Sequence, residues 1–193
     1  MTDESTDDLK TMTAAGVGDA DYSELEDLGQ MIADQVESFL LAIREIARGD
    51  DSGRAVPLLL LEVSQLLLGG ARLAAHVDIV PAEKYEPDAG PDPDLDALRE
   101  RLAQLLGGAD EYVEVFDPYE EPPELVFSKL SDDLAGIASA VAHGLRHHRA
   151  GRLDEALWSW QFSYVSSWGA EASAALRALQ SVISHDRLDT SRL

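Results

Sequence analysis

The stretch that decides the fold is PLLLLEVSQLLLGGARLAAH, residues 57–76. On a helix it is apolar around most of its circumference. The polar residues share one narrow stripe: Glu62, Gln65, Arg72 and His76. Pro57 suits a first helical turn, where its missing N–H costs nothing. Charged side chains within the stretch would be costly at a bilayer centre, so it predicts the central helix of a bundle and no membrane span.

Apolar residues recur every three or four positions along most of the remaining chain, and clusters of proline and glycine separate these segments. Leucine and alanine dominate the 45% of residues that are apolar, which favours helix over sheet. A chain of 193 residues suffices for one core. The sequence therefore predicts an all-α fold, a single helical bundle of about five long helices at about 24–48, 55–76, 94–116, 131–149 and 154–185, with a bend at Gly169.

Two domain-level segments follow from the composition. Residues 1–22 are acidic and show no apolar periodicity, which predicts a disordered acidic N-terminal tail before a bundle domain at 23–189. Prolines interrupt the segments 78–94 and 117–127, which predicts two irregular connections. Whether these connections are ordered stays open at this stage.

The net charge of -22 is unevenly distributed. Residues 1–22, 78–94 and 117–124 together carry sixteen acidic and two basic side chains, or -14 of that charge. Such a surface repels phosphate backbones and anionic lipids, so we expect no direct nucleic-acid binding and no membrane binding. A salt-adapted proteome and a basic protein partner both remain explanations for the acidity.

The residue types and motifs that the sequence lacks exclude several classes of chemistry. The chain has no cysteine, which removes disulfides, thiolate metal sites and cysteine nucleophiles. Nucleophile-elbow, Walker and dinucleotide-binding motifs are missing, so we assign no catalytic residue and expect no cofactor. The first residues, MTDESTDD, lack the basic and apolar regions of a secretory signal, so we expect a cytoplasmic protein.

The polar stripe at 62–76 allows two interpretations. Together with two polar side chains of the last helix it could line a pocket for a small molecule or a reaction; the candidate set is Glu62, Gln65, Arg72, His76, Gln161 and Tyr164. An amphipathic helix also requires a solvent-facing strip, and the stripe fits that role equally. The sequence does not say which side of the helix faces solvent.

A positive cluster ends the helix predicted at 131–149: Arg146, His147, His148, Arg149 and Arg152. It could accept a carboxylate or phosphate from a partner. It could also neutralise the helix end and pair internally with Glu120, Glu121 and Glu124. His143 and His147 have the i, i+4 spacing of metal-binding histidines, but Arg146 between them opposes a cation and no further ligand is evident, so we assign no metal site.

Aromatic residues concentrate in the last helix. Trp160, Tyr164 and Trp168 repeat every four residues, which is typical of a core face. Trp158 and Phe162 project from another side, and large aromatics are common at interaction hot spots. The three tryptophans, Trp158, Trp160 and Trp168, are therefore candidates for either the core or a partner surface that includes the positive cluster.

Four stretches carry a family resemblance: ADQVESFL (33–40), PLLLLEVSQLLL (57–68), VFDPYE (115–120) and EALWSWQFSY (155–164). They resemble an uncharacterised actinobacterial family catalogued as a domain of unknown function, over about residues 31–189. Membership implies a bacterial cytoplasmic protein and supplies no activity, substrate or site residue.

These features lead us to expect a non-enzymatic protein-interaction domain, adaptor or regulatory, with a protein partner of basic character. Two alternatives remain: a small-molecule-binding or enzymatic bundle, and an acidic nucleic-acid mimic directed at a basic partner. The oligomeric state is left open.

Overall fold

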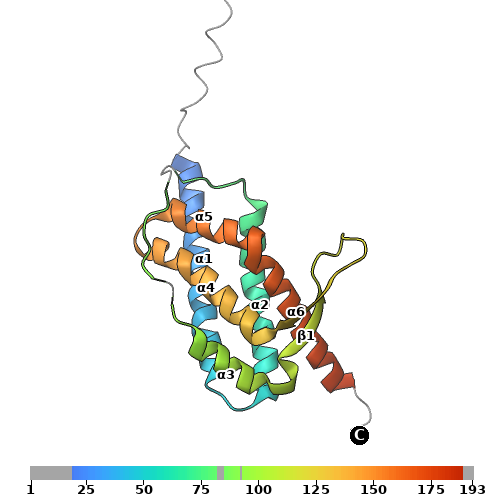
Figure 1. The fold of residues 1–193 in the computed structure, drawn as a ribbon. Coiled ribbons are helices and arrows are strands. Elements are labelled where there is room, and N and C mark those ends of the chain that lie inside the picture. Colours follow the sequence, from blue (N-terminus) through green and yellow to red (C-terminus); the bar gives the residue numbers. More distant parts are fainter. Residues whose placement is uncertain (1–18, 82–84, 92, 189–193) are drawn as a thin grey trace, which may run out of the picture.

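The computed structural model describes residues 19–81, 85–91 and 93–188 (Figure 1). The elements are α1 (Asp19–Ala47), α2 (Ser52–Ala75), α3 (Asp96–Leu106), β1 (Glu111–Val115), β2 (Leu125–Lys129), α4 (Leu130–Arg149), α5 (Leu153–Ser163) and α6 (Gly169–Leu188). The all-α class is confirmed, with one small two-stranded sheet added to the bundle. The tail predicted at 1–22 lies outside the described residues up to position 18, and α1 already begins at Asp19.

The central helix of the bundle is α4, which packs against α1, α3, α5 and α6. Half of its residues are buried, including Leu134, Ile137 and Val141. The expectation that 57–76 would be the central helix is wrong in this respect, because Leu58, Leu61 and Leu68 of α2 lie exposed. By length and composition alone α2 could cross a membrane. Its other side is buried, however, and packs mainly against α1 and α6.

The helix predicted at 94–116 is wrong beyond Leu106. Gly107 has a φ of +53°, which is accessible to glycine, and a 3-10 turn at Gly107–Ala109 ends the helix. The following residues, EYVEV, include one tyrosine and two valines, which favour a strand over a helix. They form β1, which pairs antiparallel with β2, within the segment expected to be a connection.

Asp110 joins this β-hairpin to the start of α4. Its carboxylate is buried and accepts hydrogen bonds from the Ser131 backbone N–H (2.8 Å) and hydroxyl (2.9 Å). Its carbonyl oxygen accepts a further bond from the Leu130 N–H, at 2.9 Å. A carboxylate at a helix N-terminus satisfies free N–H groups and is favoured by the helix dipole. Asp110 therefore fixes where the hairpin ends and α4 begins.

The helix predicted at 154–185 is divided into two. A π-helical turn at Tyr164–Trp168 separates α5 from α6, and the chain changes direction there (Figure 1). The bend expected at Gly169 is therefore present, immediately before that glycine. A Cβ at position 169 would lie 2.5 Å from the carbonyl oxygen of Tyr164, so only glycine fits this close approach without a shift of the backbone.

Candidate functional site

The polar stripe of α2 does not combine with α5 into a pocket. Gln65 and Arg72 lie exposed and Glu62 is partly buried, which raises its pKa, whereas Gln161 is buried. The Gln161 amide donates to the carbonyl oxygen of Leu73 (2.9 Å) and accepts from the N–H of Ile79 (2.9 Å). Gln161 therefore satisfies the last turn of α2 and holds the chain that follows it, where His76 ends the helix.

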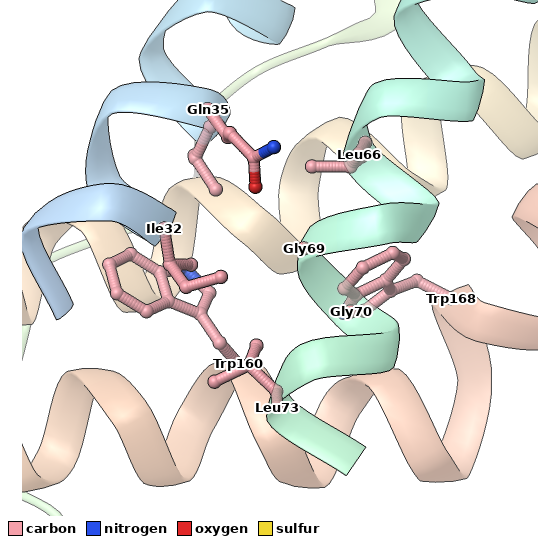
Figure 2. Close-up of a pocket in the computed structure, with 9 residues that line it drawn as sticks. Ile32, Gln35, Leu66, Gly69, Gly70, Leu73, Trp160 and Trp168 are labelled. Atoms are coloured by element: carbon pink, nitrogen blue, oxygen red, sulfur yellow. The ribbon is translucent and has the colours of Figure 1, made fainter. Parts of the chain in front are cut away.

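A small cavity does lie between α1, α2 and the tryptophans of α5 and the π turn (Figure 2). Its volume is about 10 Å³, which is room for about one water molecule. Its lining is apolar except for Gln35, whose amide donates to the carbonyl oxygen of Gln65 at 3.3 Å. Tyr164 packs edge-on against Trp168 nearby. The residues of the expected polar pocket thus do not enclose space for a small molecule here.

Two of the three tryptophans considered for a partner surface are core residues. Trp160 and Trp168 are fully buried, and the Trp160 ring N–H donates to the carbonyl oxygen of Val141 at 2.9 Å. Their assignment to a partner surface is therefore wrong, and their four-residue spacing does mark the core. Trp158 is half-buried and stacks on Phe162, which is 59% exposed, with ring centroids 5.5 Å apart.

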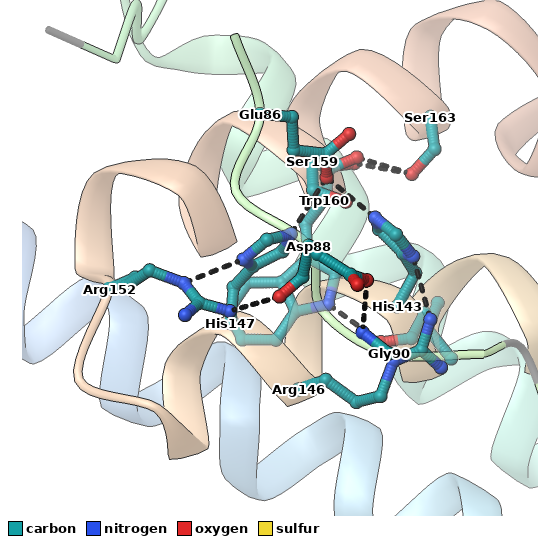
Figure 3. A network of polar contacts seen from close by, with 11 residues as sticks. Glu86, Asp88, Gly90, His143, Arg146, His147, Arg152, Ser159, Trp160 and Ser163 are labelled. Carbon is teal, nitrogen blue, oxygen red and sulfur yellow. Dashed lines mark hydrogen bonds and ion pairs between the residues drawn. The ribbon is translucent and has the colours of Figure 1, made fainter. Parts of the chain in front are cut away.

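The positive cluster at the end of α4 is brought together with Glu86, from the connection after α2 (Figure 3). His143 and His147 lie one turn apart on α4, and both direct Nε2 at the same carboxylate oxygen, Glu86 Oε1, at 2.6 and 2.7 Å. His147 is fully buried, and Glu86 and His143 are each about one-third exposed. Sequence reasoning missed Glu86 because it lies 57 residues before His143, in a segment without periodicity.

Two arginines contact the far side of these imidazoles. Arg146 lies 2.8 Å from His143 Nδ1, and the Arg152 Nε–H donates to His147 Nδ1 at 3.1 Å. A guanidinium can only donate, so both Nδ1 atoms accept. In a neutral imidazole the proton is then on Nε2, which donates to Glu86. Although burial raises the pKa of Glu86, the bonds from His143 and His147 are strong enough to bring it below its usual value.

The rest of the cluster is also used within the domain. Arg149 forms an ion pair with Glu37 of α1 at 2.8 Å, and the His148 ring lies beside Trp160. The expected pairing with Glu120, Glu121 and Glu124 is wrong. Those residues lie in the hairpin that leads into the N-terminal end of α4, and the cluster lies at the other end, about 30 Å away at 1.5 Å per residue.

The inner face of the hairpin buries a group of carboxylates at the N-terminal end of α4. The Tyr112 hydroxyl donates to Asp133 Oδ2 at 2.7 Å, and the Ser128 hydroxyl donates to Glu114 at 3.0 Å. Burial raises the pKa of Asp133 to about 6; the Tyr112 bond lowers it, and Glu114, Glu171 and Asp132 raise it further. Burial, followed by the nearby Glu114, also raises the pKa of Glu171.

The middle of the outer face of the hairpin is apolar and open to solvent, and the exposed Glu111–Lys129 ion pair lies at its end next to α4. Val113 and Phe127 pair across the strands and are 51% and 87% exposed; Leu125, opposite Val115, is 64% exposed. Phe116 and Tyr119, which follow β1 towards the tip of the hairpin, are also exposed. Five acidic residues flank these side chains in sequence: Glu111, Asp117, Glu120, Glu121 and Glu124. We call Val113, Leu125, Phe127, Phe116 and Tyr119, together with the five acidic residues that flank them, the hairpin surface. The tyrosine and valines of EYVEV are the signal that could have predicted a strand here.

Comparisons with known proteins support the fold and family. A family model described as "Domain of unknown function (DUF5063)" matches residues 23–185, which confirms the resemblance proposed for about 31–189. The crystal structure of protein BF1032 from Bacteroides fragilis is similar, with a TM-score of 0.62 at 20% identity, covering 78% of this chain and 89% of that one. At this identity the likeness concerns the fold alone. No curated protein matches.

Proposed function

Since the chain belongs to the domain-of-unknown-function family DUF5063, we propose its function from its surface. It is a cytoplasmic protein-interaction domain that binds a basic segment of a partner protein across the hairpin surface. The observation that carries this proposal is the exposed apolar face of Val113, Leu125 and Phe127.

The exposure of these side chains is unusual for a strand face. An antiparallel sheet normally alternates, with apolar side chains towards the core and polar ones towards water. Here the inner face carries Tyr112, Glu114 and Ser128 beside Val126. The middle of the outer face carries valine, leucine and phenylalanine, with the Glu111–Lys129 pair at its end. Contiguous exposed apolar residues bordered by polar ones are typical of interaction sites. A partner that covers Phe127 and Leu125 would recover hydrophobic free energy that the isolated domain forgoes.

Charge indicates the kind of partner. The hairpin tip carries Asp117, Glu120, Glu121 and Glu124 with no basic residue between 117 and 124. The whole chain has a net charge of -22, so a second copy approaching this face is repelled. A partner segment that combines apolar side chains with lysine or arginine is complementary in both respects. Edge N–H and C=O groups of the two-stranded sheet also allow such a segment to add a strand.

The test is site-specific crosslinking in the native cells. A photo-crosslinking amino acid at position 127 should capture a defined partner, and mass spectrometry should locate the crosslink in a segment rich in lysine and arginine. The same amino acid at position 41 is the matched control, because Leu41 is equally an exposed apolar residue but lies on α1, away from the acidic tip. Crosslinks at 127 that join only two copies of this chain would contradict the proposal.

A second experiment separates the apolar and acidic contributions. Val113→Ser with Phe127→Ser removes the apolar face, and Glu120→Gln, Glu121→Gln and Glu124→Gln together remove the tip charge. Both variants should weaken binding of the captured segment, but only the charge variant should reduce its dependence on salt. If the charge variant alone abolished binding and the serine variant had no effect, the surface would act as a polyanion, as in the nucleic-acid-mimic alternative.

A further inference from the structure

The cluster of Glu86, His143 and His147 has the composition and arrangement of a metal site. The three candidate ligand atoms, Glu86 Oε1 and the two Nε2 atoms, all lie within 4.8 Å of one another. Histidines at i and i+4 of a helix direct their rings to the same side, and α4 is a well-packed helix that holds them in place. The sequence supplied this pair but no third ligand. The structure supplies Glu86, on a separate element.

We propose that Glu86, His143 and His147 bind one divalent transition-metal ion of the zinc class. Two imidazoles and one carboxylate suit Zn²⁺, Co²⁺ or Ni²⁺ better than Mg²⁺ or Ca²⁺, which prefer ligand sets made of oxygen alone. His147 is fully buried beneath the site, while His143 and Glu86 are partly exposed. Three protein ligands with one side open to solvent leave a coordination position for water or another ligand.

The distances require a small adjustment. Ligand atoms around a tetrahedral zinc ion, each about 2.0–2.1 Å from the metal, are about 3.3 Å apart. Glu86 Oε1 lies 2.6 and 2.7 Å from the two nitrogens, as expected for hydrogen bonds. The carboxylate must therefore withdraw by about 0.7 Å to admit the ion. Glu86 lies outside any helix or strand and is about one-third exposed, so it can withdraw without a change in the bundle. The two Nε2 atoms, which lie within 4.8 Å of each other, must also approach to about 3.3 Å, which requires the partly exposed His143 ring to turn towards the buried His147.

Arg146 and Arg152 oppose metal binding. When Nε2 binds a metal the ring proton moves to Nδ1, where Arg146 and Arg152 now donate. Each guanidinium must turn away, and its charge also repels the ion. Arg152 has a second contact, to the carbonyl oxygen of Asp88 at 3.5 Å. Removing the Arg152 charge should therefore tighten metal binding, by about tenfold if the gain is about 1.4 kcal/mol. An anion-binding site would respond in the opposite direction.

The experiment uses the full chain without a histidine tag, stripped of metal and titrated with Zn²⁺ by calorimetry. One ion per chain should bind. Co²⁺ in its place should give the visible absorption of a tetrahedral site. His143→Ala and Glu86→Gln should each weaken Zn²⁺ binding by at least about tenfold. His148→Gln is the matched control on the same helix and should leave it unchanged. Because His147 is buried, His147→Ala is interpreted only if circular dichroism shows native helix content.

Two results would overturn the proposal. One is a wild-type chain that is not saturated by about 1 mM Zn²⁺, or whose affinity does not change in His143→Ala and Glu86→Gln. The other comes from Arg152→Leu titrated with both Zn²⁺ and inorganic phosphate. If Arg152→Leu weakens phosphate binding and does not tighten Zn²⁺ binding, the cluster is an anion site. The cluster and the hairpin lie at opposite ends of α4, so neither outcome bears on the proposed partner surface.

Discussion

At its N-terminal end α4 contacts carboxylates, among them Asp110, Asp133 and Glu171, whereas its C-terminal end carries arginines and histidines. Both choices agree with the helix dipole, which favours negative charge at the first turn and positive charge at the last. The ends differ in what lies outside them. The C-terminal cluster is paired with residues of other elements, Glu37 and Glu86, while the N-terminal end supports a hairpin whose outer face is exposed. The charged groups at both ends of α4 are therefore matched by opposite charge or dipole within the domain. The N-terminal end differs because exposed apolar side chains lie beside it, on the outer face of the hairpin.

The largest expected effect concerns the N-terminal end. Asp110→Ala removes the acceptor for both the N–H and the hydroxyl of Ser131 and leaves those buried groups without a partner. We expect the free energy of unfolding to fall by about 2–4 kcal/mol, measured by urea denaturation. Asp132→Ala is the control: its side chain is exposed and forms an exposed ion pair with Arg99, so the loss should stay below about 1 kcal/mol. Equal losses would show that charge near the helix end, and not hydrogen bonding, fixes the hairpin.

The corresponding loss of unfolding free energy at the C-terminal end of α4 should be smaller. In metal-free protein, Glu86→Ala removes the shared acceptor of His143 and His147. The loss should be about 1–2 kcal/mol, because His147 is buried but His143 and Glu86 are partly solvated. Glu37→Ala, which breaks an exposed pair with Arg149, should cost less than about 0.5 kcal/mol by the same urea measurement. If both changes cost equally little, Glu86 does not hold its segment against α4.

Asp133 should make the N-terminal end sensitive to pH. Its pKa in the folded state is about 6, above the unfolded value of 3.8, so the folded chain holds the proton more tightly. The stability that this group contributes is fully present below pH 3.8 and is lost as the pH rises through 6. Asp133→Asn stays neutral and still accepts from Tyr112, so it should stabilise the domain at pH 8 by about 1 kcal/mol, a value reduced for solvent screening.

The measurement is urea denaturation of both proteins from pH 4 to pH 8. The advantage of Asp133→Asn should shrink as the pH falls below 6 and disappear near the unfolded pKa. Asp132→Asn, one residue away and exposed, should show a much smaller trend, because its charge is the weakest of those that raise the pKa of Asp133. A constant difference at every pH would mean that Asp133 is not titrating in this range.

The ends of α4 also show what the sequence could predict. Apolar periodicity predicted helices at about 24–48, 55–76 and 131–149, which the structure has at 19–47, 52–75 and 130–149, since burial of one face is a local property of the pattern. The first turn of α1, residues 19–22, carries no such pattern and was assigned to the tail. The hairpin was missed because two five-residue strands gave too little pattern beside a leucine-rich helix. Glu86 was out of reach, because its meeting with His143 depends on the path of an irregular segment across 57 residues. The helical spacing of Trp160 and Trp168 indicated that both are buried. The hypothesis that they form a partner surface relied instead on the frequency of tryptophan at interfaces.

The smallest expected change in the free energy of unfolding comes from substitutions on the hairpin surface. Val113→Ser and Phe127→Ser change side chains that are already exposed, so each should alter the free energy of unfolding by less than about 0.5 kcal/mol. The inner-face change Tyr112→Phe should cost more, about 1 kcal/mol, because it removes the bond to Asp133. This difference matters for the proposed function, because a phenylalanine that is 87% exposed contributes little to folding and is accessible to a partner. A large loss of stability in Phe127→Ser would instead assign that side chain to the fold and remove the main support for a partner at this face.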